Sequence, residues 1–135
     1  MDDLLREAFR ATAYHVNVDT LTWAMIRVDL PLPAELMAAV GTQPWAFITA
    51  WNPQARRRAA PDNIVAQQAL LAALQDLSGV TVYPAIGVGS SGWSEPSLFV
   101  IGADTAAIDP LARLHRQLAY VHGHADGAAV LRELD

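Results

Sequence analysis

The sequence predicts an α+β fold: a single domain with a mixed β-sheet of about five to seven strands, packed with two to four helices. Two observations predict this class. The chain has 135 residues, the length of one domain, and can bury a hydrophobic core without disulfide bonds. Along it, strand-like segments occur both in hairpins and in strand–helix–strand units. We therefore expect one domain over residues 1–135.

The N-terminal part is expected to form a helix, a hairpin and a second helix. Asp2–Arg10 begins with acidic residues, which the dipole of a helix N-terminus favours. Ala11–Val18 and Leu21–Val28 flank a polar turn and are predicted to be paired strands. A short helix at Pro33–Val40 starts with a proline, which suits the first turn, and is stopped by Gly41.

The middle of the chain contains the clearest strand and the longest helix. Trp45–Trp51 alternates apolar side chains on both faces, so we place it in the interior of a sheet that is covered on both sides. The helix is expected over Pro61–Leu77 and is ended by Gly79. Its predicted buried stripe consists of Ala66, Leu70, Ala73, Leu74 and Leu77.

In the C-terminal part, strands are predicted at Val80–Ile86 and Ser97–Ile101, joined by a glycine-rich loop. Asp109 and Pro110 have the pattern of a helix cap and a first-turn proline, which predicts a helix over Pro110–Arg116. The chain is expected to finish with a strand at Gln117–His122 and with a strand or short helix at Ala128–Leu134.

The composition excludes several classes of function. The net charge of -5 disfavours general binding to nucleic acids or anionic membranes. Cysteine and lysine are both absent, which excludes thiolate chemistry, a P-loop and a pyridoxal Schiff base. The start of the chain lacks the pattern of a signal peptide, and no apolar run is long enough to span a membrane, so we expect a cytoplasmic protein. No cofactor is predicted, and a homodimer formed through an edge strand is possible.

The segment Gly87–Gly92 matches the spacing of a dinucleotide-binding loop and follows a predicted strand. That chemistry also needs a helix directly after the loop, because the pyrophosphate rests on helix N–H groups. Pro96 and the strand that follows it leave no room for this helix. We interpret the segment as a loop between two strands.

His122 and His124 are candidate metal ligands, since imidazoles two residues apart share one face of a strand. Asp126 could supply an oxygen ligand, and His115 could join them. The neighbouring glycines are equally typical of a turn with solvated side chains. We therefore predict no metal site and keep His122 and His124 as the candidate ligands if one is present.

Arg56, Arg57 and Arg58 precede the start of the longest helix. Guanidinium groups beside free N–H groups suit a phosphate or a carboxylate, which makes these three residues a candidate anion-binding site. The alternative is a solvated loop without a ligand.

Glu95 lies between Trp93 and Pro96, beside an apolar strand. A carboxyl group in such surroundings can have a raised pKa and act as a general acid or base. Its structural alternative is to accept hydrogen bonds from backbone groups or from an arginine. Trp93 is the only tryptophan expected in a loop and is a candidate ligand contact.

Several short segments resemble the DUF3293 domain family, a bacterial family of uncharacterised small proteins. The resemblance covers about residues 12–132 and includes Gly87, Gln117, Ala119 and the segments Phe47–Pro53, Pro61–Asn63 and Trp93–Ser97. The chain departs from the family pattern in the three arginines after Pro53 and in His115–Arg116, where a Phe-Gly pair is usual. The resemblance implies no activity and no catalytic residues.

The resemblance groups polar residues that lie at strand ends, helix starts or adjacent loops. We expect Asn52 and Asn63 to approach one another where the strand ends near Trp51. Glu95 and Ser97 join them only if their strand is a neighbour that runs in the same direction. The candidate ligand-binding residues are Thr49, Asn52, Asn63, Trp93, Glu95, Ser97 and Gln117.

Three functions follow from this set. The first is a binding module for a small polar or anionic ligand, or for a protein partner, since amides and hydroxyls position ligands and no nucleophile is evident. The second is a hydrolase or transferase with Glu95 as general base, which needs a partly buried Glu95 facing a cleft. In the third, Asn52, Asn63 and Glu95 only tie loops to the sheet, and the function lies in a protein interface.

Overall fold

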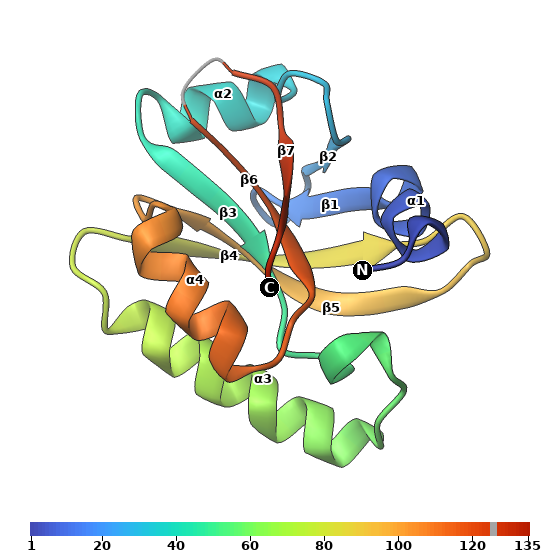
Figure 1. Cartoon of the computed structure of the whole chain (residues 1–135). Coiled ribbons are helices and arrows are strands. Elements are labelled where there is room, and N and C mark those ends of the chain that lie inside the picture. Colours follow the sequence, from blue (N-terminus) through green and yellow to red (C-terminus); the bar gives the residue numbers. More distant parts are fainter. Residues whose placement is uncertain (125–126) are drawn as a thin grey trace.

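The computed structural model describes residues 1–124 and 127–135. In these ranges it contains four α-helices, a short 3-10 helix and seven strands (Figure 1). The helices are α1 (Asp3–Ala11), α2 (Ala34–Val40), α3 (Ala60–Gln75) and α4 (Thr105–Leu114), with the 3-10 helix at Pro53–Ala55. The strands are β1 (Ala13–Asn17), β2 (Trp23–Ile26), β3 (Pro44–Ile48), β4 (Thr81–Val88), β5 (Ser94–Ile101), β6 (Ala119–His124) and β7 (Val130–Glu133).

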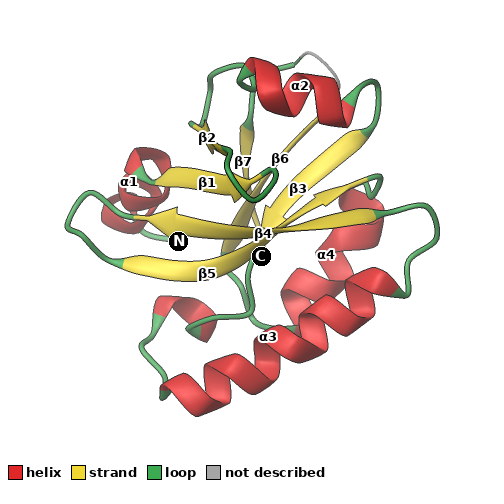
Figure 2. Ribbon diagram, turned by 180° about the vertical axis from the view of Figure 1, so that it is seen from behind, coloured by secondary structure: helices red, strands yellow, loops and turns green. Residues whose placement is uncertain are grey.

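The seven strands form one curled sheet with the order β2-β1-β4-β5-β3-β6-β7, a half-barrel (Figures 1 and 2). The α+β class and the expected numbers of strands and helices are confirmed. All pairings between the described strands are antiparallel, so the sheet lacks the parallel pairs that a mixed sheet would have. As predicted, β3 lies inside the sheet, between β5 and β6.

Each face of the sheet has its own hydrophobic core, because side chains alternate along every strand. The helices α3 and α4 lie on the convex face (Figure 2). There Ile48 and Val100 pack with residues of both helices, including Leu70 and Leu74 of the predicted buried stripe. On the concave face, Trp45 and Phe47 of β3 pack with the aromatic side chains of neighbouring strands. The interior of the half-barrel is therefore a second, separate core.

Two helices lie over the ends of the concave face. Leu36 and Val40 of α2 are fully buried in the concave core and fill one end of it. Gly41 ends α2 as predicted, with a φ of 59° that favours glycine. At the other end, α1 covers the sheet without a fully buried residue of its own. This difference leaves space beneath α1.

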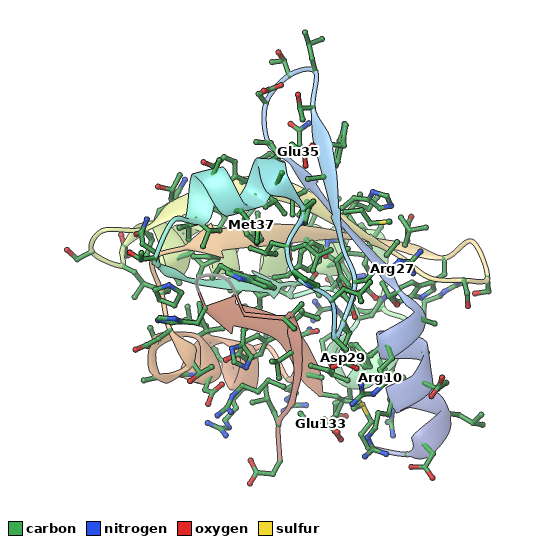
Figure 3. The ribbon with its side chains drawn as sticks, turned by 90° about the horizontal axis from the view of Figure 1, so that it is seen from above. Arg10, Arg27, Asp29, Glu35, Met37 and Glu133 are labelled. Carbon is green, nitrogen blue, oxygen red and sulfur yellow. The ribbon has the colours of Figure 1, made fainter. Side chains whose placement is uncertain are left out.

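The two edges of the half-barrel meet in a short seam. Pro31 forms an isolated bridge with Ala128, and backbone hydrogen bonds join Asp29 to Ala129 at 2.8 Å and Ala129 to Leu30 at 2.9 Å. Arg10 of α1 reaches the same region and pairs with Asp29 at 2.7 Å (Figure 3). Contacts after β2 and before β7 thus partly close the sheet.

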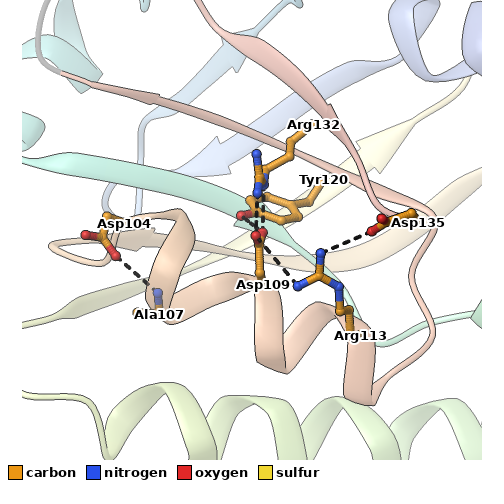
Figure 4. Close-up of polar contacts among 7 residues, drawn as sticks. All are labelled: Asp104, Ala107, Asp109, Arg113, Tyr120, Arg132 and Asp135. Carbon is orange, nitrogen blue, oxygen red and sulfur yellow. Dashed lines mark hydrogen bonds and ion pairs between the residues drawn. The ribbon is translucent and has the colours of Figure 1, made fainter.

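The helix predicted at Pro110–Arg116 begins earlier, at Thr105. The cap is Asp104, whose carboxylate accepts from the N–H of Ala107 at 3.1 Å (Figure 4). Asp109 is therefore not a helix cap. It lies in the middle of α4, next to Pro110, and its side chain faces β6 and β7.

Other boundaries also differ from the expectation. The Gly87–Gly92 segment belongs to the β4–β5 hairpin, and β5 already begins at Ser94. No helix follows these glycines, as predicted, so the dinucleotide-binding arrangement is absent there. β6 continues to His124 where a turn was considered, and the C-terminal element is a strand.

Within residues 1–124 and 127–135, no helix has both the length and the apolar character that crossing a membrane requires.

Candidate functional site

A cavity of about 340 Å³ lies between α1 and the concave face of the sheet. Its walls come from three sources: α1, the strand residues that face inward, and the loops at this end of the half-barrel. It is lined by Leu5, Ala8, Phe9, Thr12, Tyr14, Phe47, Thr49, Trp51, Asn52, Ala55, Arg57, Gly87, Gly89, Ser90, Ser91, Trp93, Glu95, Ser97, Gln117, Leu118, Ala119, Tyr120 and Val121. We call it the Glu95 cavity.

Tyr14, Gly87 and Glu95 lie in one row across β1, β4 and β5, because each is paired with the next. Directly paired residues share one face of a sheet, so all three face the cavity. Gly87 has no side chain, and a Cβ atom there would lie 3.7 Å from Thr12 and 4.0 Å from Phe47. The glycine therefore leaves open the space beside the Glu95 carboxyl group.

Glu95 is 9% exposed. Its Oε2 accepts one hydrogen bond, from Nδ2 of Asn52 at 3.1 Å, and no arginine or histidine of the described residues pairs with it. Burial raises the pKa of Glu95 to about 7, and the hydrogen bond from Asn52 partly opposes this. The carboxyl group is therefore close to half protonated at neutral pH.

The second oxygen of Glu95 is open to the cavity. No hydrogen bond reaches Oε1 from the described residues. Among these residues, the only completely inaccessible side-chain polar atom without a partner is Nε1 of Trp45, so Oε1 is not sealed in the protein. A bound molecule can thus contact Oε1 while Asn52 holds Oε2 in place.

Asn52 links Glu95 to the loop behind it. Its backbone is left-handed, with a φ of 47°, and its N–H donates to Oδ1 of Asn63 at 2.9 Å. The two amides also bond directly, from Nδ2 of Asn63 to Oδ1 of Asn52 at 2.9 Å. Asn63 is 1% exposed and does not line the cavity. The predicted approach of the two asparagines is confirmed, and Asn63 lies behind Asn52.

Glu95 joins this group even though its strand does not run in the same direction as β3. β5 is antiparallel to β3, with Ile48 paired to Leu98. The start of β5 therefore lies beside the end of β3, where the chain continues to Asn52. The expectation that only a strand of the same direction could bring Glu95 here was wrong.

Three further candidates line the cavity, and each makes hydrogen bonds to the backbone. Thr49 donates to the carbonyl of Pro96 at 2.8 Å, Ser97 donates to the carbonyl of Glu95 at 3.1 Å, and Gln117 donates to the carbonyl of Trp51 at 3.1 Å. The Thr49 contact joins the end of β3 to β5, and the Gln117 contact joins the segment before β6 to the segment after β3, whereas the Ser97 contact stays within β5.

Aromatic side chains form much of the remaining wall. Tyr14 packs edge-on against Phe47 with a ring separation of 5.0 Å, and its hydroxyl donates to the carbonyl of Phe9 at 2.6 Å. Trp93 is 46% exposed and lies at the rim, in the loop predicted for it. The cavity therefore combines aromatic and aliphatic walls with polar side chains that include Asn52, Glu95 and Gln117, a mixture that is typical of small-molecule sites.

Of the three arginines after Pro53, one is partly buried and two are exposed. Arg58 turns inward: its Nε donates to Oδ1 of Asn63 at 2.9 Å and its Nη2 donates to the carbonyl of Ala50 at 3.2 Å. Arg56 and Arg57 stay exposed. All three line a second, open hollow of about 460 Å³, together with Pro53, Gln54, Leu114, His115 and Arg116. We call it the arginine hollow.

The candidate metal ligands are not gathered. His122 and His124 lie two residues apart on β6, but His115 lines the arginine hollow. Asp126 lies outside the described residues. In the part of the chain that the structure describes, no group of three His, Asp or Glu side chains is arranged to hold a metal ion.

Several cavity residues were missed from the sequence. Leu5, Ala8 and Phe9 of α1 and Tyr14 of β1 belong to elements whose distance from Glu95 along the chain gives no hint of contact. The repeated apolar positions of the N-terminal helix were the available signal, since they indicate a face that must pack on something.

The comparisons with known proteins give a family and no activity. The model of the family described as "Protein of unknown function (DUF3293)" matches residues 48–120, more than half of the chain. No curated protein and no solved structure matches. The matched range includes Asn52, Glu95 and Gln117 but excludes α1 and β1, which form one wall of the cavity. This chain belongs to the DUF3293 family.

Proposed function

We propose that this domain binds a small, mainly apolar molecule in the Glu95 cavity. The observation that carries the proposal is the free Oε1 of Glu95 on the floor of an apolar cavity, next to an Oε2 that Asn52 already holds. A buried carboxyl group with a hydrogen bond to only one of its two oxygens is incompletely satisfied, so a ligand that donates a hydrogen bond to Oε1 or brings a positive charge would be favoured there. The preformed cavity reduces the entropy that binding must overcome.

Native mass spectrometry of the protein as purified from cells tests this proposal. We expect an added mass that corresponds to a small organic molecule. The matched variant is Gly87→Val, whose side chain would extend from the β4 backbone toward Thr12 and Phe47 and fill the space beside Glu95. It should lose the added mass while keeping the circular dichroism spectrum. An added mass that persists equally in Gly87→Val would place the ligand elsewhere and refute the proposal.

A second candidate is an enzyme in which Glu95 acts as general base or acid, in a hydrolase or transferase. One observation favours it: the pKa of Glu95 is raised to about 7, where a carboxyl group can both accept and donate a proton at neutral pH. Asn52 and Gln117 would orient the substrate. Once the native ligand is identified, its turnover should show a pH profile with an apparent pKa near 7 that disappears in Glu95→Gln. Binding without turnover would reject the enzymatic role.

The cellular compartment and the binding partner of the domain are also proposals. We propose a cytoplasmic domain that acts on a small molecule, with a homodimer through an edge strand as the next possibility. Trp23 and Met25 of the edge strand β2 are 55% and 43% exposed, which supports the second idea. Light scattering of wild type and Trp23→Glu would test it: a monomeric wild type would exclude the dimer.

A further inference from the structure

The arginine hollow concentrates positive charge in a protein that is acidic overall. Four of the nine arginines line it, Arg56, Arg57, Arg58 and Arg116, whereas the whole chain has a net charge of -5. Like charges held together repel one another unless a counter-charge is present. The hollow therefore favours a negatively charged ligand.

No carboxylate of residues 1–124 and 127–135 supplies a counter-charge to the hollow. Its lining residues include no aspartate or glutamate. The ion pairs of the described residues involve Arg6, Arg10, Arg113 and Arg132, and none of the four arginines of the hollow. Asp62, the nearest carboxylate along the chain, does not line the hollow.

The hollow is built on a fixed frame. Arg58 is anchored by its bonds to Asn63 and to the carbonyl of Ala50, so one guanidinium group is held in place before any ligand arrives. The two loops that form the walls are joined by a hydrogen bond from the N–H of Gln54 to the carbonyl of Arg116 at 2.8 Å. Both of these residues have left-handed backbones, with φ of 58° and 54°. Held loops of this kind lower the entropy lost on binding.

We infer that the arginine hollow binds a multiply charged oxyanion of the phosphate class, such as a pyrophosphate or a phosphate ester of a soluble molecule. Guanidinium groups form paired hydrogen bonds with phosphate oxygens, and several of them suit an anion that carries more than one charge. Arg57 lines both the hollow and the Glu95 cavity. A ligand whose apolar part lies in the cavity could therefore place its phosphate in the hollow, although the inference does not depend on the proposed function.

The test is a titration of the full chain with pyrophosphate at low ionic strength, followed by calorimetry and by amide chemical shifts. We expect saturable binding, with the largest shifts at Arg56–Arg58 and at His115–Arg116. The double variant R56Q/R57Q should weaken the affinity at least tenfold, since both side chains are exposed and their loss leaves the fold intact. The matched control is Arg10→Gln, which removes one arginine outside the hollow and should leave the affinity unchanged.

Two further ligands, acetate and vesicles, show which kind of anion the hollow binds. Acetate, which carries a single charge, should bind far more weakly than pyrophosphate. Vesicles that contain phosphatidic acid should not compete with free pyrophosphate, because the hollow is concave. The absence of saturable binding, an affinity unchanged in R56Q/R57Q, or binding to vesicles alone would overturn the inference. Because Gly87→Val changes only the cavity, it should leave pyrophosphate binding intact, so failure of one proposal is distinguishable from failure of the other.

Discussion

At the scale of single residues, the protonation of Glu95 couples the cavity to the stability of the fold. Its pKa is raised to about 7 in the folded state by burial, above the ordinary carboxyl value of 4.5. Between these two pH values the folded state keeps a proton that the unfolded chain loses. The free energy of unfolding should therefore fall as the pH rises from about 4.5 to about 7, and then stay level with respect to this group.

Glu95→Gln should remove that loss, because an amide stays neutral and can still accept the hydrogen bond from Asn52. We expect the variant to be more stable than the wild type by roughly 2 kcal/mol at pH 8 and about equal to it at pH 4. Urea denaturation across this pH range measures the difference. The control is Glu35→Gln on the exposed face of α2. The free energy of unfolding of this variant should change with pH in the same way as that of the wild type. A constant gap between Glu95→Gln and wild type would show that Glu95 has no raised pKa.

Asn63 is the structural centre of the polar group. Its Oδ1 accepts from the N–H of Asn52 and from Nε of Arg58, and its Nδ2 donates to Oδ1 of Asn52 and to the carbonyl of Arg58. Asn63→Ala leaves these buried groups without partners and should cost about 3 kcal/mol of stability by urea denaturation. Asn17→Ala removes one exposed hydrogen bond and should cost under about 1 kcal/mol. Equal losses in the two variants would contradict this role.

The sequence predicted which polar residues gather here, but not which of them face the cavity and which face the protein interior. Asn52 and Asn63 were expected to approach, because both lie next to the end of one strand and the start of one helix. Whether an amide faces a ligand or the protein depends on side-chain direction, which a strand or helix boundary does not reveal. The inward turn of Arg58 escaped prediction for the same reason, since its partners are the buried amide of Asn63 and a strand-end carbonyl.

At the scale of elements, α4 is fastened to the C-terminal hairpin by one carboxylate. Asp109 accepts hydrogen bonds from the hydroxyl of Tyr120 at 2.6 Å and from the guanidinium group of Arg132, and Arg113 lies 3.9 Å away (Figure 4). Arg113 also reaches Asp135 at 3.3 Å. The hydrogen bonds from Arg132 hold the pKa of Asp109 at about 2, below its ordinary value of 3.8.

This ion pair should make the protein sensitive to acid. Because the folded-state pKa of Asp109 is depressed, its contribution is present above pH 4 and is lost as the pH falls from about 4 to about 2. Asp109→Asn should lose roughly 2 kcal/mol at pH 7 and show a shallower loss in acid than wild type. Thermal unfolding between pH 2 and pH 7 measures both, with Asp76→Asn, at the exposed residue that follows α3, as the comparison. If the stability of Asp109→Asn falls between pH 4 and pH 2 as steeply as that of the wild type, Asp109 is not the source of the acid sensitivity.

The boundary of α4 shows where sequence signals compete. Asp104 and Asp109 both have a residue type that caps helices, and Pro110 made the second appear to be the start. The helix begins at the first because Asp109 is needed by Tyr120 and Arg132, which lie 11 and 23 residues further along the chain. Long-range partners of this kind override a local pattern. Where no such competition exists, as at Gly41 after α2, the predicted boundary is confirmed.

At the scale of the whole molecule, the position of most strands could be predicted, but their order could not. β3 pairs with β5 and β6, which are separated from it by α3 and α4 in the sequence. Alternation marks a strand without naming its neighbours, and so the curl of the sheet and the cavity under α1 had no signal in the sequence.

The seam that partly closes the half-barrel should open more easily than the paired strands of the sheet. Among the described residues, the Asp29–Ala129 and Ala129–Leu30 backbone bonds and one bridge are all that join the two edges there, whereas β4 and β5 are paired over eight residues each. Hydrogen exchange should therefore be faster at the amides of Asp29 and Ala129 than at those of Phe99 and Val100. Equal protection at all four amides would mean that the seam opens only when the whole protein unfolds.

The distribution of the four tryptophans gives the molecule an optical property of its own. Trp51 and Trp93 line the Glu95 cavity, Trp45 is 1% exposed in the concave core, and Trp23 is 55% exposed on β2. Indole emission shifts with the polarity around the ring, so two of the four chromophores should respond when the cavity fills. A variant that carries Trp23→Phe would remove the emission of the exposed tryptophan that lies outside the cavity. Occupancy of the cavity could then be followed in the native chain, without an attached dye, by the colour of its fluorescence.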